Sequence, residues 1–262
     1  MKMKVISFNA NGIRSAAKKG FYEWLQLQQA DFVCIQETKA QINQLIPESL
    51  YFPPEFHCEY YDAVKKGYSG VAIYARQKPL QVVKGLGFDY CDTEGRYIQF
   101  DYPGLSVVSL YLPSGSSGDA RQVVKYDFLE RLAKHLLDLK AAGRELIICG
   151  DYNIAHKNID IKNWRGNQKN SGFLPEERAW LDQLFGESGY VDAFRVKNQA
   201  EEEYTWWSNR GQARANNVGW RIDYQVITPG LVEHVNEVAI YRDIRFSDHA
   251  PLLIDYQGDF CA

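Results

Sequence analysis

The sequence predicts a layered α/β sandwich in which helices cover mixed β-sheets. Two apolar runs, residues 97–101 and 105–112, are joined through Tyr102-Pro103-Gly104, which is a hairpin signal. Other apolar runs alternate with helix-like segments, as they do in strand–helix–strand units. Because hairpins give antiparallel neighbours and strand–helix–strand units give parallel ones, the mixture argues against a purely parallel doubly wound sheet.

Strands are expected wherever a short apolar run is bounded by turn residues. In chain order they are residues 4–8, 32–35, 71–75, 97–101, 105–112, 146–149, 224–227, 238–241 and 252–256. The first run follows a charged start, and Asn9 ends it after too few apolar residues for a signal peptide. No apolar run approaches the roughly 20 residues needed to cross a membrane, so we expect a soluble protein without a membrane partner.

Helical periodicity is clearest over residues 121–142, which Gly143 ends. The apolar residues at helical spacing are Val124, Phe128, Leu132, Leu136 and Leu139. A shorter helix is predicted at 22–28, and another begins at Pro175, with acidic residues in its first turn. Four long irregular stretches, predicted to be loops that carry function, are 51–67, 113–119, 156–174 and 208–219.

No low-complexity stretch divides the 262 residues, so we expect one domain spanning 1–262. The net charge of −3 argues against a protein that binds nucleic acid through its overall charge alone. An anionic substrate must therefore be bound by a local group of positively charged side chains. The basic segment 210–221 is one candidate. Basic runs are more often solvated faces than binding sites, but Trp206, Trp207 and Trp220 strengthen this candidate.

The cysteines are odd in number and have neither C-x-x-C nor zinc-like spacing. They are Cys34, Cys58, Cys91, Cys149 and Cys261. We expect reduced thiols in a cytoplasmic protein, which we expect to be a monomer.

Polar and acidic groups stand at the ends of five apolar runs, where open α/β sheets bind their ligands. They are Asn9 with Asn11, Gln36 with Glu37, Asp151 with Asn153, Asp223, and Asp248 with His249. These groups supply hard oxygen and amide ligands plus one imidazole, a set that suits magnesium better than zinc. The sequence therefore predicts a phosphodiester-cleaving metal site.

Six phrases, each common alone, occur in a specific order over residues 5–256. They are Asn9-Ala10-Asn11-Gly12-Ile13-Arg14, Gln36-Glu37-Thr38-Lys39, Gly67-Tyr68-Ser69-Gly70-Val71, Gly150-Asp151-Tyr152-Asn153, Gly219-Trp220-Arg221-Ile222-Asp223 and Ser247-Asp248-His249. In these phrases the chain resembles the exonuclease III family of apurinic/apyrimidinic (AP) endonucleases. The resemblance implies a four-layer α/β sandwich with two mixed β-sheets flanked by helices.

The resemblance also implies a Mg²⁺-dependent hydrolase of base excision repair, in which Mn²⁺ can substitute. Such an enzyme incises duplex DNA 5′ to abasic sites and trims blocked 3′ ends. The resemblance leaves open 3′-to-5′ exonuclease activity and the number of metals.

For the metal, we assign Glu37 to magnesium, with Asn9, Asn11 and Asp248 nearby. From the residues alone, ordinary turn chemistry around Gly12 is the better explanation of the two asparagines, and the family match reverses that ranking in favour of the metal. A second metal could be held by Asp151, Asn153 and His249.

For the chemistry, Asp151 would orient and deprotonate the attacking water, or protonate the leaving oxygen. Asn153 would donate its amide to the phosphate or to Asp151. His249 would donate to a non-bridging oxygen or act as a base, with Asp223 fixing its tautomer. Tyr111 matches a family tyrosine that reaches the phosphate, although the residues alone would fit an ordinary strand aromatic.

For specificity, Trp206, Trp220 and Ile222 match the family's apolar pocket for a flipped-out abasic sugar. Further matched positions resemble contacts to the DNA backbone, which position the duplex without reading its sequence. They are Arg14, Lys39, Tyr68, Asn167 and Asn170.

Two positions depart from the family pattern. Ser114 stands where many members have an asparagine, so that phosphate contact is in doubt. Asn11 replaces the aspartate of one branch, which implies one less negative charge at the metal site.

Two other functions were weighed. A phosphatase or phospholipase of the same fold would act on inositol phosphates or sphingomyelin, but the pocket tryptophans match the DNA branch. A noncatalytic binder of damaged DNA would keep the pocket and lose the acids, all of which are present.

Overall fold

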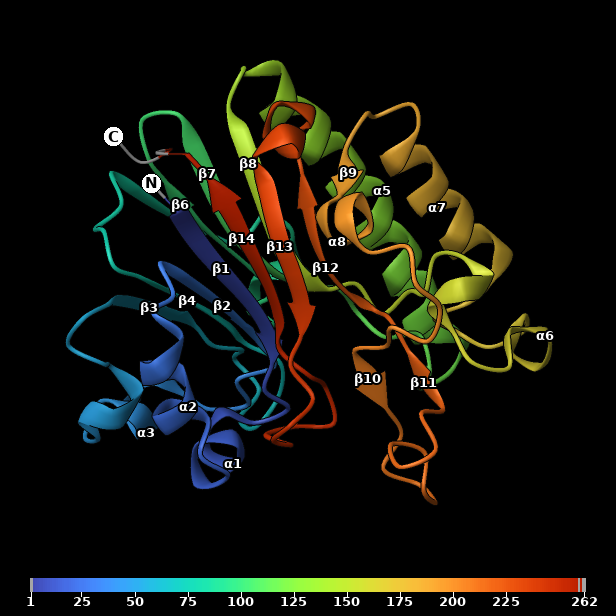
Figure 1. Ribbon diagram of the computed structural model, residues 1–262, viewed down its shortest axis with the longest axis horizontal. Helices are drawn as coiled ribbons and strands as arrows, with labels where there is room; N and C mark the ends of the chain where they lie inside the picture. Colours follow the sequence, from blue (N-terminus) through green and yellow to red (C-terminus); the bar gives the residue numbers. More distant parts are fainter. Residues whose placement is uncertain (1, 259, 261–262) are drawn as a thin grey trace.

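Two six-stranded sheets lie face to face in the computed structural model, which describes residues 2–258 and 260 (Figure 1). The first sheet has the order β13-β14-β1-β2-β4-β3. Its strands are β1 (Lys2–Asn9), β2 (Phe32–Gln36), β3 (His57–Tyr61), β4 (Val71–Ala75), β13 (Val235–Ile240) and β14 (Leu252–Gln257). Within it β1 and β2 are parallel and the other pairs antiparallel, so the sheet is mixed.

The second sheet has the order β5-β6-β7-β8-β12-β9 and is also mixed, since β7 and β8 are parallel. Its strands are β5 (Gln81–Lys84), β6 (Tyr97–Asp101), β7 (Leu105–Tyr111), β8 (Glu145–Asp151), β9 (Val191–Asp192) and β12 (Asp223–Ile227). A separate two-stranded ribbon pairs β10 (Trp206–Trp207) with β11 (Gly219–Trp220).

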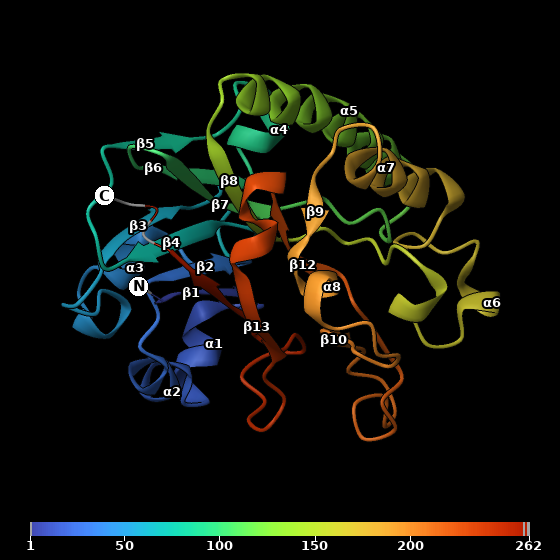
Figure 2. The same ribbon diagram turned by 45° about the horizontal axis from the view of Figure 1, so that its top comes forward.

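Helices cover the outer faces of both sheets, so the sandwich has four layers (Figure 2). The helices of the described residues are α1 (Ile13–Lys18), α2 (Phe21–Gln28), α3 (Ile42–Leu45), α4 (Asp89–Asp92), α5 (Asp119–Ala141), α6 (Trp164–Asn167), α7 (Pro175–Phe185) and α8 (Ala193–Lys197). Of these, α8 packs into the core between the two sheets instead. The 3₁₀ turns of the same residues are η1 (Ser49–Tyr51), η2 (Asn158–Asp160) and η3 (Pro229–His234). The predicted mixed-sheet sandwich is confirmed.

Of the five apolar clusters among the described residues, the three largest hold the layers together, and each follows from the pattern of the strands. The central core lies between the sheets and includes Val5, Cys34 and Cys149. The alternate residues of the same strands face outward, as Ile6 does toward α1 and α2 and Ile148 does toward α5 and α7. Strands buried on both faces therefore read as unbroken apolar runs.

Several predictions about loops and helices were wrong in detail. The stretch 51–67 contains β3, and β5 was not predicted at all. Both are edge strands with mostly half-exposed residues, so their apolar signal is weak. The stretch 156–174 contains α6 and η2. In α5, Val124 is only half-buried, and Lys125 takes the core position beside it.

Cys34, Cys58, Cys91 and Cys149 are free thiols, while Cys261 lies outside the described residues. Among the described helices, none combines the length and the apolar character that a membrane span requires.

Candidate active site

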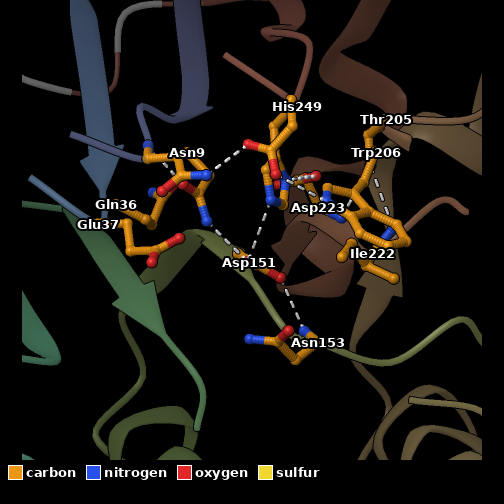
Figure 3. A network of polar contacts seen from close by, with 12 residues as sticks. Asn9, Gln36, Glu37, Asp151, Asn153, Thr205, Trp206, Ile222, Asp223 and His249 are labelled. Atoms are coloured by element: carbon orange, nitrogen blue, oxygen red, sulfur yellow. Dashed lines mark hydrogen bonds and ion pairs between the residues drawn. The ribbon is translucent and has the colours of Figure 1, made fainter. Parts of the chain in front are cut away.

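Polar side chains from both sheets converge at one end of the sandwich (Figure 3). In the second sheet Asp151, at the end of β8, is paired in register with Tyr111 of β7 and with Asp223 of β12. In the first sheet β1 ends at Asn9. The Asn9 side-chain amide donates a 2.8 Å hydrogen bond to Asp151 Oδ2, which joins the two sheets at the site.

Asp151 is held from two sides and is only 2% exposed. Its Oδ2 accepts the bond from Asn9, and its Oδ1 accepts a 2.8 Å bond from the backbone N–H of Asn153. Burial and the neighbouring Asp223 carboxylate raise the pKa of Asp151 to about 7. A carboxyl group with this pKa can both take and give a proton near neutral pH.

His249 lies behind Asp151 and contacts two carboxylates. Its Nδ1 is 2.9 Å from Asp223 Oδ2, and its Nε2 is 3.8 Å from Asp151 Oδ2. Burial opposes a charge on the imidazole, yet Asp223 and Asp151 raise the pKa of His249 to about 10. The ring is therefore an imidazolium at neutral pH, with Nε2–H available as a donor.

The chain segment that carries His249 is fixed by the β10–β11 ribbon. Trp206 forms a β-bridge with His249, and the backbone N–H of Ala250 donates a 2.7 Å bond to the carbonyl of Thr205. The Thr205 hydroxyl oxygen accepts bonds from the backbone N–H groups of Ile222 and Asp223, at 3.1 and 3.2 Å. The ribbon thus ties the histidine to the start of β12.

Asn11, Glu37, Lys39 and Asp248 form a second cluster beside the first. The Asn11 side-chain amide donates a 2.9 Å bond to Asp248 Oδ1, and Trp206 Nε1 donates a 3.1 Å bond to Asp248 Oδ2. Lys39 Nζ lies 2.8 Å from Glu37 Oε1 and also donates to Asn11 Oδ1. Glu37 Oε1 and Asn11 Oδ1 therefore both contact the Lys39 ammonium group.

Asn153 and Tyr111 flank Asp151. The side-chain amide of Asn153 donates to the Leu112 carbonyl at 2.9 Å, so the contact to Asp151 comes from the Asn153 backbone. Burial, and secondarily Glu37, raise the pKa of Tyr111, so its hydroxyl keeps its proton. The Arg96 guanidinium stacks 4.7 Å from the centre of the Tyr111 ring.

A large open cavity of about 1010 Å³ extends over this site. Of the sequence-predicted residues, those that line it are Asn11, Glu37, Lys39, Tyr111, Asp151, Asn153, Asn167, Asn170, Trp206, Trp220, Ile222, Asp248 and His249. The rings of Trp206 and Trp220 meet edge to face, 6.0 Å apart, and form an aromatic wall. Asn170 and Asn167 also line the cavity, and the Asn170 side-chain amide donates a 2.8 Å bond to Asn167 Oδ1.

The remaining predicted residues lie elsewhere. Asn9 and Asp223 are buried behind the lining side chains. Arg14 is exposed on α1 and does not line the cavity. Tyr68 also lies outside it, where its hydroxyl oxygen accepts bonds from Arg96 at 3.1 Å and Arg121 at 3.2 Å.

Sequence reasoning missed Lys125 and Glu177, a fully buried ion pair just behind the cavity wall. Lys125 reads as a surface residue of an amphipathic helix, and Glu177 reads as a helix-dipole partner in the first turn of α7. One signal was available: Lys125 is in helical phase with Phe128, Leu132 and Leu136, which all face the core.

The acids and the imidazole could hold a metal ion. Ligand atoms of Asp151, Asp223 and His249 lie within 4.8 Å of one another. Carboxylate and amide oxygens suit hard divalent cations, which the Glu37 and Asn11 oxygens also fit. Fold and site together define a two-sheet α/β hydrolase with its reactive groups where the sheets meet.

Comparison with known proteins identifies the family of two-sheet α/β hydrolases to which the chain is similar. Residues 6–249 match the endonuclease/exonuclease/phosphatase family. The chain is 40% identical over 252 residues to an exodeoxyribonuclease of Bacillus subtilis (strain 168), covering 95% of this chain and 98% of that protein. It is 38% identical over 260 residues to the DNA repair nuclease APEX1 of Danio rerio, covering 96% and 81%.

A solved AP endonuclease from Archaeoglobus fulgidus superimposes with a TM-score of 0.88, at 28% identity, over 98% of this chain and 100% of that one. The protein belongs to the endonuclease/exonuclease/phosphatase family and is a hydrolytic enzyme. The expected resemblance to the exonuclease III type of AP endonuclease is confirmed by these relatives.

Proposed function

We propose that this protein is a DNA repair nuclease that incises duplex DNA 5′ to abasic sites and trims blocked 3′ ends. One observation carries the proposal: Asp151 and His249, with Asp223 behind them, line the same cavity as the Trp206–Trp220 wall. The relatives' activities, which their names give as exodeoxyribonuclease and AP endonuclease, support the same substrate.

The donor set supports Mg²⁺ as the metal, with Mn²⁺ able to replace it. Glu37 and Asn11 already share the Lys39 ammonium, so a cation is favoured at their oxygens. With Asn9 and Asp248 nearby, these residues would hold the ion. When bound, the ion would polarise the phosphoryl group and stabilise the developing negative charge.

A second ion at Asp151, Asn153 and His249 fits less well. Because the pKa of His249 is raised to about 10, the ring holds protons on both nitrogens at neutral pH, and an ion there would have to displace the Nε2 proton. This charge state favours His249 as a hydrogen-bond donor to a non-bridging phosphoryl oxygen over a role as base. Asp223 would keep it charged and oriented.

Asp151 would handle the proton of the reaction. With a pKa of about 7 it can accept a proton from the attacking water or give one to the leaving oxygen. The backbone N–H of Asn153 and the amide of Asn9 bind its two oxygens, which fixes the orientation of the carboxyl group. Tyr111, protonated at neutral pH, would donate to the phosphate.

Trp206, Trp220 and Ile222 would select the lesion. An apolar wall accepts a deoxyribose that lacks its base, whereas an intact nucleotide would bring a base into the same space. An abasic nucleotide also costs less to extrude, because it has no stacking or pairing to lose. Lys39, Asn167 and Asn170 on the rim would contact the backbone of the duplex.

The test uses a duplex with one tetrahydrofuran abasic analogue and an undamaged duplex, each with Mg²⁺ and with EDTA. Magnesium-dependent nicking immediately 5′ to the analogue is expected, and Asp151→Ala should abolish turnover while DNA binding remains measurable. Release of phosphate from inositol phosphates, without nicking, would refute the proposal and move the function to the phosphatase alternative.

A further inference from the structure

Lys125 of α5 and Glu177 of α7 form an ion pair that no solvent reaches. Both side chains are 0% exposed, and Lys125 Nζ lies 2.5 Å from Glu177 Oε1. Bringing two charges out of water costs about as much as their attraction returns, so such a pair contributes little net stability. Stability alone therefore does not explain why both charges are there.

Glu177 accepts hydrogen bonds from five donors, which explains how its charge is tolerated. Its Oε1 accepts from Lys125, from the Gln122 side chain at 3.0 Å and from the Ser171 hydroxyl at 3.3 Å. Its Oε2 accepts from the backbone N–H of Gly172 at 2.6 Å and from that of Leu174 at 3.1 Å. The carboxylate thereby fixes the segment 171–174, which forms part of the cavity wall.

Lys125 makes a second contact on the side of the reactive carboxylate. Its Nζ donates a 2.9 Å bond to the backbone carbonyl of Asn153. Asn153 has a φ of +51°, in the left-handed region that non-glycine residues occupy only when their surroundings hold them. The same residue presents its N–H to Asp151 Oδ1, so the lysine holds the turn that holds Asp151.

Gly172 lies against both the Trp220 ring and the Asp151–Asn153 turn, which are two parts of the cavity wall. A Cβ at this position would lie 3.0 Å from Trp220 Cζ3 and 3.1 Å from the Asn153 carbonyl oxygen. Its own carbonyl accepts a 2.8 Å bond from the backbone N–H of Ala155. The glycine thus touches both the aromatic wall and the Asp151 turn, and Glu177 fixes where it lies.

We propose that Lys125 and Glu177 are a positioning pair, which sets the distance between the Asp151–Asn153 turn and the Trp220 wall. The inference rests on the proposed function and deepens it: neither residue touches DNA, and the pair acts through Asn153 and Gly172. A shift of about 1 Å between reacting groups can cost about a hundredfold in rate, so a modest relaxation of the pair is measurable.

The test compares Lys125→Met, Glu177→Gln and the double variant on a duplex with a tetrahydrofuran abasic analogue. Lys125→Met leaves Glu177 with four donors, so we expect it to fold. For each variant we expect kcat to fall by about tenfold to a hundredfold, with KM changing by less than about threefold. Because the two residues are joined by their own ion pair and act as one unit, the double variant should lose about as much as the worse single variant.

The matched control is Leu136→Ala, which opens a cavity in the core on the same helix, away from the pair. It should lower Tm at least as much as Lys125→Met while kcat stays within about twofold of wild type. The proposal would be overturned if Leu136→Ala lost as much kcat as Lys125→Met at the same loss of Tm. It would also be overturned if the loss of kcat in the double variant equalled the product of the two single losses.

Amide hydrogen exchange gives a readout that does not depend on the substrate. Lys125→Met should speed exchange at Asn153 by more than about tenfold, and Glu177→Gln should do so at Gly172, while amides in β8 stay protected. Unchanged exchange at both amides would overturn the positioning pair. Failure of the wild-type enzyme to nick the abasic duplex would instead overturn the proposed function, and the exchange result would still decide on the pair.

Discussion

Replacing Asp223 by Asn tests whether His249 works as a charged donor. The change removes the carboxylate 2.9 Å from Nδ1 and keeps its size. Without that charge the pKa of His249 should fall from about 10 toward the ordinary value of 6.5, because burial disfavours the imidazolium and only Asp151 and Asp248 still raise the pKa.

The size of the effect follows from the fraction of protonated ring. At pH 8 a group with a pKa of 6.5 is roughly 3% protonated, whereas one with a pKa near 10 is about 99% protonated. If the charged ring is required, Asp223→Asn should be slower than wild type at pH 8 by up to about 30-fold, the limit reached when the pKa falls to 6.5. At pH 6 the ring is about three quarters protonated in the variant, and the deficit should shrink to less than about twofold.

Single-turnover nicking of an abasic duplex between pH 5.5 and 9 would measure this, expressed as the ratio of variant to wild-type rate. Because Asp223 also raises the pKa of Asp151, the Asp151 carboxyl must be titrated by NMR in both proteins, and its ionised fraction is divided out of the ratio. NMR titration of the His249 ring would give its pKa directly. A rate ratio independent of pH, or an unchanged ring pKa, would refute the reasoning.

Three further predictions follow from the site and its surroundings. Glu37→Ala should raise the Mg²⁺ concentration needed for half-maximal nicking about tenfold or more, and a metal titration with an unchanged midpoint would contradict the assignment. Trp220→Ala should slow abasic cleavage more than 3′-end trimming, and equal losses on the two substrates would argue against the lesion pocket. Asp160 is buried, yet Arg221 and Arg195 lower its pKa to about 2, so its contribution to stability is present above pH 3.8 and lost as the pH falls toward 2. Asp160→Asn should therefore cost about 3 kcal/mol in urea unfolding at pH 7 and flatten the acid limb of the stability curve; an unaltered limb would contradict this.

The sequence predicted the strands and strand-end acids well because both follow from local pattern. A strand buried on both faces is an unbroken apolar run, so residues 146–149 located β8 and hence Asp151. The edge strand β3 was missed because only one of its residues is buried. In this fold, a strand can be predicted from a single sequence when both of its faces are buried.

The positioning pair of Lys125 and Glu177 could not be predicted from local sequence pattern. The burial of Lys125 depends on Glu177, 52 residues later in the chain, and on a helix packing that no local pattern specifies. The Asn153 contact shows the same limit, because its side chain binds Leu112, 41 residues away, instead of Asp151. Chemistry that depends on which distant segments meet needs the three-dimensional structure.

The order of strands has a consequence for how the enzyme is made. β14 lies between β1 and β13, and Asp248 and His249 immediately precede it in the chain. During translation β1 could pair with β2 early, but its other neighbour, β14, is made more than 200 residues later. A growing chain that already carries Glu37 and Asp151 would have no His249 beside them, so the nuclease would become competent to cut only after the segment from Asp248 to β14 has been made and has docked.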